Sequence, residues 1–168
     1  MNAGLLIARV VFGLLFAVHG SQKLFGWVGG HGISGTAGFL EGLGFRPGRL
    51  FAAAVGVAEC GGGLLLALGL FEPVAAAAII SVMIVAMVTV HWRFGLLSTT
   101  NGIEVPLLYA AAALSLALTG PGSYSIDAVL GLSAWWTPQL TLVVVIAGML
   151  AGLAVLGMRR PSPAVAHA

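Results

Sequence analysis

Three residues that can donate hydrogen bonds or exchange protons stand close together near the end of an apolar run. His19, Gln22 and Lys23 follow the run that begins near Leu5. Holding an imidazole, an amide and an ammonium group in hydrocarbon costs free energy, so other polar groups must meet them there. Such groups could donate hydrogen bonds to a carbonyl-bearing molecule and relay protons to it.

A carboxylate that could take part lies in the next apolar run. Glu59 is near the middle of residues 49–70, about 15 Å from either membrane surface by the rise of a helix. A carboxylate at that depth must be protonated, paired or beside water. Arg9 and His19 lie at depths from which either side chain could reach Glu59. A buried ion pair that fixes helix register would explain the same residues, and both interpretations stay open.

The polar residues of the first run share one face of its predicted helix. A single helix over residues 5–25 places residues three, four and seven apart on the same stripe. A polar stripe does not suit a lipid-facing surface, so we expect it to face the interior of a bundle. Its members are Arg9, Phe12, Phe16, His19 and Lys23.

The composition indicates an integral membrane protein. Of 168 residues, 60% are hydrophobic and only 7% are charged, whereas soluble domains carry about 25% charged residues. So few charges give no indication of nucleic-acid binding. Cys60 is the single cysteine, which excludes an intramolecular disulfide, a CxxC redox centre and a cysteine-rich metal site within this chain.

Five apolar runs approach the length that spans a bilayer as a helix. The fourth is short, and we expect its neighbours to tilt or the bilayer to thin around it. Between the first two runs, either a short helix from Ser34 to Gly42 lies on the membrane surface or the segment is a mobile loop. We expect an interfacial segment at 123–138 and disorder from Pro161 onward. The predicted spans are residues 5–25, 49–70, 74–91, 104–118 and 140–158.

The distribution of Lys and Arg predicts the orientation. Five spans place six of these residues on the side reached after the first, third and fifth spans, and Arg9 at most on the other. By the positive-inside tendency, the N-terminus is outside and the C-terminus cytoplasmic. The six are Lys23, Arg46, Arg49, Arg93, Arg159 and Arg160. Taken singly, Lys23, Arg46, Arg49 and Arg93 are typical of cations that snorkel to the headgroups.

Three segments in order resemble the DoxX family of small bacterial membrane proteins. They are HGSQKLFG at 19–26, Glu59 followed by GGGLLLALGL at 61–70, and NGIEVPLLY at 101–109. The resemblance covers residues 5–130 and implies a four-helix membrane bundle in a redox setting. DoxX-like proteins are similar to the DoxD subunit of a thiosulfate:quinone oxidoreductase, and a mycobacterial relative is associated with a superoxide dismutase and a sulfurtransferase. The fifth span departs from the family pattern.

The fold prediction is therefore an all-α membrane bundle in the bacterial inner membrane. We expect a four-helix DoxX-like core at 1–130, an interfacial segment and additional span at 131–160, and a tail at 161–168. The candidate polar pocket consists of His19, Lys23, Glu59, Asn101 and Glu104, with Arg9, Gln22 and His91 as secondary candidates.

Two functions of different classes fit this pocket. One is a subunit or accessory of a membrane oxidoreductase, in which a quinone headgroup accepts hydrogen bonds and a partner protein supplies the electrons. The other is a non-enzymatic scaffold that recruits soluble partners. No CxxCH attachment or second histidine pair supports haem, and no tight ligand spacing marks a metal site. The oligomeric state is left open.

Overall fold

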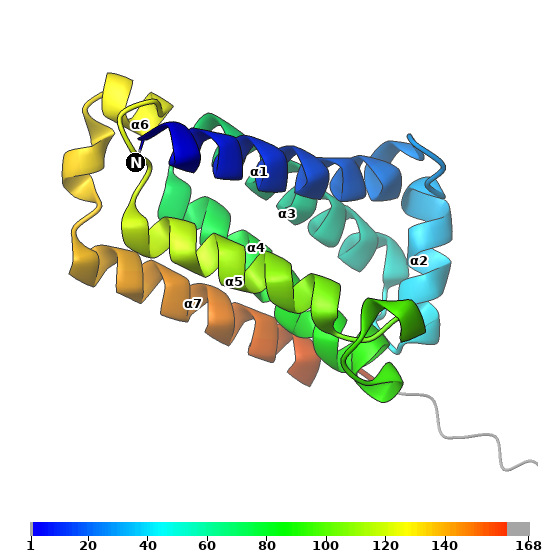
Figure 1. Cartoon of the computed structure of the whole chain (residues 1–168). Coiled ribbons are helices and arrows are strands. Elements are labelled where there is room, and N and C mark those ends of the chain that lie inside the picture. The colour runs from blue at the N-terminus through cyan, green and yellow to red at the C-terminus, as the bar shows by residue number, and fades with distance from the viewer. Residues whose placement is uncertain (1, 161–168) are drawn as a thin grey trace, which may run out of the picture.

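The computed structural model describes residues 2–160, and helices and turns account for all the regular structure in that range. Helix α4 continues into a π-helical turn, Met87–His91, and a 3-10 turn, Trp92–Phe94. Two more 3-10 turns lie at Ser98–Thr100 and Leu132–Trp135. The α-helices, coloured in chain order in Figure 1, are α1 Asn2–Phe25, α2 Gly32–Gly42, α3 Gly48–Leu68, α4 Glu72–Ala86, α5 Glu104–Thr119, α6 Ile126–Val129 and α7 Pro138–Gly157.

The all-α membrane bundle predicted from the sequence is confirmed. Helices α1, α3, α7 and the continuous segment Glu72–Phe94 are each long and apolar enough to cross a membrane. Helix α5 is apolar but shorter, with 16 residues. All five run alongside one another from one end of the bundle to the other (Figure 1).

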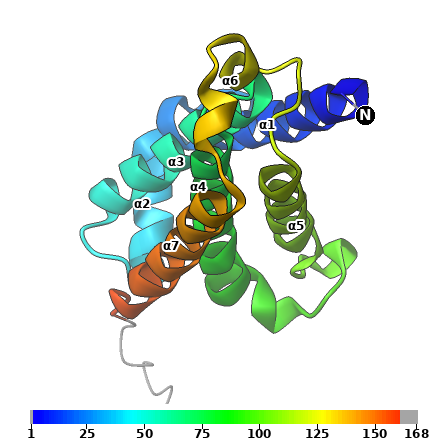
Figure 2. The ribbon, with the colours of Figure 1, turned by 90° about the vertical axis from the view of Figure 1, so that its left-hand side faces the viewer.

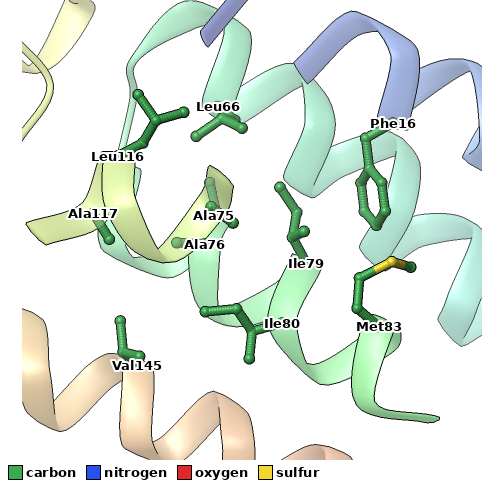
Figure 3. Packing of buried hydrophobic residues seen from close by; sticks show 11 residues of the cluster. Phe16, Leu66, Ala75, Ala76, Ile79, Ile80, Met83, Leu116, Ala117 and Val145 are labelled. Carbon is green, nitrogen blue, oxygen red and sulfur yellow. The ribbon is translucent and has the colours of Figure 1, made fainter. Parts of the chain in front are cut away.

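Helix α4 lies at the centre of the bundle. It packs against α3, α5 and α7, while α1 packs mainly against α3. Viewed along the bundle, α4 lies between α5 and α7, and α1 and α3 lie above it (Figure 2). The buried cluster in Figure 3 therefore combines side chains from all five helices, among them Phe16, Leu66, Ile79, Leu116 and Val145.

Glycines bring α1 and α3 unusually close together. A Cβ atom on Gly20 would overlap the backbone of Cys60, and one on Gly63 would overlap the backbone of Ala17. Small residues permit this approach because nothing separates the two backbones. Gly62 likewise lies close to Ala78 of α4. Ala54 and Ala58, which precede it at four-residue spacing, line a cavity instead.

Helix α2 confirms the helical alternative for the glycine-rich connection. It begins at Gly32 after His31, two residues before the expected cap at Ser34, and no side chain caps it. Phe39, Leu40 and Leu43, at the end of this helix, line the same cavity. The tail predicted for residues 161–168 lies outside the described residues.

Different elements lie at the two ends of the bundle. The N-terminal end of α1 lies next to α6 and the 3-10 turn Leu132–Trp135, whereas α2 crosses the opposite end (Figure 1). At this α2 end, the end of α7 contacts the corner between α2 and α3. Arg159 Nε donates to the Leu43 carbonyl at 2.5 Å and the Arg160 N–H donates to the Gly44 carbonyl at 2.8 Å.

Candidate functional site

An ion pair joins α1 to α3 at the α2 end of the bundle. Lys23 Nζ lies 2.5 Å from Glu59 Oε2. The Glu59 side chain is 5% exposed and that of Lys23 is 30% exposed. The close α1–α3 packing sets this geometry, because Gly20 lies directly against Cys60, the residue after Glu59. Lys23 therefore does not extend to the headgroups as an isolated cation would.

A cavity of about 520 Å³ opens beside this ion pair. Its walls come from α2, α3, α4 with its π-helical turn, and the end of α7, and they are mostly apolar. Lys23 and Glu59 lie in its wall, as do His91 and three hydroxyl side chains. The apolar lining is Phe39, Leu40, Leu43, Phe45, Leu50, Phe51, Ala54, Val55, Ala58, Val82, Val85, Ala86, Val90, Val155 and Met158, and the hydroxyls are Thr36, Ser81 and Thr89.

The loop after the π-helical turn positions His91. Its Nδ1 lies 2.7 Å from the backbone carbonyl oxygen of Asn101. Asn101 adopts a left-handed conformation, with φ of 65°, which asparagine tolerates better than most residues. Glu104 Oε2 accepts a hydrogen bond from the Ser98 N–H at 2.7 Å. The Asn101 backbone and the Glu104 side chain thus order this loop, and neither residue lines the cavity.

His19 and Gln22 face other surroundings. The His19 ring is exposed and meets Tyr109 of α5 edge-on, with 6.1 Å between ring centroids. Gln22 Nε2 donates to the Val28 carbonyl at 3.0 Å and thereby holds the loop after α1. Neither lines the cavity. Of the five primary candidates, the structure therefore brings Lys23 and Glu59 together at its wall.

Arg9 lies at the opposite end of the bundle and does not reach Glu59, so that pairing prediction is wrong. Its guanidinium is fully buried and donates to the carbonyl oxygens of Pro121 at 2.5 Å and Tyr124 at 2.7 Å. These acceptors lie in the loop between α5 and α6. Because backbone carbonyls engage the guanidinium, it ties the start of α1 to that loop.

Two carboxylates near Arg9 were not among the candidate residues. Asp127 of α6 is buried and accepts hydrogen bonds from the Phe71 N–H at 3.0 Å, the Glu72 N–H at 3.3 Å and Trp136 Nε1 at 3.0 Å. Glu72 is fully buried as well, and no described residue hydrogen-bonds to its carboxylate. The sequence signal for a polar cluster at this end was Arg9, because a guanidinium this far into an apolar helix needs polar partners.

The cavity suits a mainly apolar molecule that carries polar atoms. Its volume lies within the range of small-molecule sites, about 300 to 1,000 Å³. The Lys23 ammonium has three N–H groups, and one is directed at Glu59. The others remain as donors at the cavity wall, while the apolar residues contact the body of a ligand.

Comparison with known proteins identifies the family. The DoxX family profile matches residues 4–92. The chain is also 29% identical over 129 residues to the inner membrane protein YqjF of Escherichia coli (strain K12), an alignment that covers 77% of this chain and 93% of that protein. No solved structure matches the chain. The relative and the apolar helices support a location in the bacterial inner membrane, and the chain belongs to the DoxX family.

Proposed function

We propose that this protein is a subunit or accessory of a membrane oxidoreductase system and binds a quinone headgroup in the cavity beside Lys23 and Glu59. The observation that carries the proposal is the cavity of about 520 Å³, whose apolar walls include an ion pair between half-buried Lys23 and buried Glu59. A quinone ring is flat and apolar, with two carbonyl oxygens that accept hydrogen bonds. The Lys23 ammonium supplies the donor for one of them.

The ion pair suits this role because Glu59 fixes the position of Lys23. A lysine on a flexible stem would otherwise extend to the membrane surface. Held at 2.5 Å from Glu59 Oε2, the ammonium stays at the cavity wall. Carboxylate and ammonium together also form a pair that can exchange a proton with a bound carbonyl oxygen.

Electrons would come from a partner protein, because the sequence contains no recognisable electron-carrier motif. The site would lie near the cytoplasmic face, since it shares the end of the bundle with the basic residues and the positive-inside tendency orients that end inward. A soluble or membrane redox partner could approach there.

The direct test is quinone binding to the purified chain in lipid nanodiscs. The probe is a fully substituted 1,4-benzoquinone with a decyl chain, whose ring cannot add the Cys60 thiol. We expect saturable binding by calorimetry that Ala58→Leu weakens at least tenfold, because leucine would occupy the cavity. Ala111→Leu on the exposed side of α5 is the matched control and should bind normally. Absence of saturable binding to the unmodified chain would overturn the proposal.

A second candidate function rests on the basic end of the bundle. The arginines beside α2 and at the end of α7 could recruit an acidic soluble partner, with the Lys23–Glu59 pair serving only to fix helix register. Glu59→Gln distinguishes the two functions. The quinone proposal predicts weaker quinone binding by this variant, whereas the scaffold function predicts lower stability in detergent with no quinone binding at all.

A further inference from the structure

His91 lines the same cavity as Lys23, and one of its ring nitrogens can accept a hydrogen bond. Its Nδ1 faces the Asn101 carbonyl oxygen at 2.7 Å. A carbonyl oxygen can only accept, so Nδ1 must carry the proton. The neutral ring then has a lone pair on Nε2, and no hydrogen bond among residues 2–160 engages that nitrogen.

Two unusual backbone conformations lie next to the His91 ring. The last turn before it is π-helical, from Met87 to His91, and such turns occur frequently at functional sites. Thr89, Val90 and His91 from this turn all line the cavity. The Asn101 carbonyl is presented by a left-handed residue. Both features fix the imidazole, and with it the direction of its free nitrogen.

Three of the other polar groups at this wall already make hydrogen bonds. The Thr89 hydroxyl donates to the Val85 carbonyl at 2.8 Å, as helix-bound threonines commonly do. The Lys23 ammonium only donates, and Oε2 of Glu59 is paired with it. The Nε2 atom of His91 is thus an acceptor without a partner for a hydrogen bond from a ligand hydroxyl.

We propose that His91 Nε2 accepts a hydrogen bond from a ligand hydroxyl, so that the cavity selects the dihydroxy form of the ring, a quinol, over the dicarbonyl form. This inference rests on the proposed quinone site and adds the redox form that it prefers. Lys23 donates to one ring oxygen and His91 accepts from a hydroxyl. A dicarbonyl ring can satisfy Lys23 but has no donor for His91.

The experiment compares the fully substituted decyl benzoquinone with its hydroquinone, kept reduced under argon, on the chain in nanodiscs. We expect the hydroquinone to bind about tenfold more tightly, the effect of one buried hydrogen bond. His91→Phe should lose that preference, so that the two forms bind with equal affinity. His91→Gln, which places an amide oxygen near the position of Nε2, should retain part of it. His19→Phe, outside the cavity wall, is the matched control and should retain all of it.

A second measurement tests the tautomer without any ligand. Nitrogen-15 NMR of histidine-labelled protein, assigned by loss of the signal in His91→Phe, should show a proton on Nδ1 and none on Nε2. Replacing Asn101 by Gly, which tolerates the left-handed backbone, should preserve this pattern, and Asn101→Val should disturb it.

The outcomes separate the two proposals. Equal affinity for the two forms, or a preference that persists in His91→Phe, would overturn the role of His91 while the quinone site stands. Failure of both forms to bind the unmodified chain would overturn the quinone site and this inference with it.

Discussion

The two ends of the bundle hold buried charge in different ways. At the α6 end, Arg9 is fully buried and its guanidinium is directed at backbone carbonyls, while Asp127 accepts from two backbone N–H groups and an indole. At the α2 end, Lys23 pairs with one carboxylate beside a cavity and stays 30% exposed. The hydrogen bonds of Arg9 and Asp127 hold loops to the helices. The Lys23 ammonium, by contrast, keeps N–H groups that a ligand could use.

The largest expected effect tests the cross-linked end. Arg9→Met leaves the Pro121 and Tyr124 carbonyls without their donor and the buried Glu72 without a nearby cation, so we expect a loss of about 4 kcal/mol in the free energy of unfolding. Reversible unfolding in mixed micelles, followed by circular dichroism, measures it. Arg49→Met, at an exposed arginine, should lose little. A loss of less than about 1 kcal/mol for Arg9→Met would contradict the structural role of this end.

Breaking the ion pair at the other end should have a smaller effect. Lys23→Met leaves Glu59 unpaired, but the partial exposure of the pair reduces the loss to about 2 kcal/mol. The double variant Lys23→Met with Glu59→Gln should recover most of it, because no unpaired charge remains. A double-mutant cycle in the same assay gives the coupling. Additive losses would show that the two side chains do not interact.

The close contact between Gly20 of α1 and Cys60 of α3 involves no charged side chain, so a substitution there tests packing alone. Gly20→Ala forces a methyl group into the backbone of Cys60, so we expect a loss of about 2 kcal/mol from overpacking. Gly38→Ala in α2 is the control, since a methyl group there meets no atom within 4 Å and should leave stability unchanged or slightly raise it. Equal effects of the two variants would contradict the close contact.

The smallest expected effect concerns the cavity itself. Ala58→Leu places apolar atoms in space that the fold leaves open, so we expect stability to rise by about 0.5 kcal/mol even as ligand binding is lost. The micelle unfolding assay and the binding assay on the same preparation show both changes. A loss of stability as large as that of Gly20→Ala would mean that this wall is closed rather than open.

The spans were predictable because twenty apolar residues in a row have few alternatives to a membrane helix. The need of Glu59 for a partner was predictable for the same reason. The identity of that partner was not, because the sequence does not show how far one helix is shifted along its neighbour. Gly20 of α1 lies against Cys60 of α3, and this alignment brings Lys23 to Glu59 and places Arg9 beside Gly69 instead.

The remaining features depend on contacts between segments distant in the chain. Asp127 meets Phe71 and Trp136 only after α6 folds over the turn between α3 and α4. The cavity likewise needs Val155 of α7 to complete a wall begun by α2. The hydrophobic pattern of one helix does not predict which distant segment it contacts. The loops that bring such segments together show no hydrophobic periodicity.

The contact between the last residues of α7 and the α2–α3 corner has a practical consequence for handling the protein. Arg160 is hydrogen-bonded to Gly44, so a fluorescent reporter or affinity label appended shortly after it would leave the bundle beside the cavity and could pull on its wall. Labels intended to report on occupancy belong at the start of α1, which lies at the end of the bundle away from α2 (Figure 1).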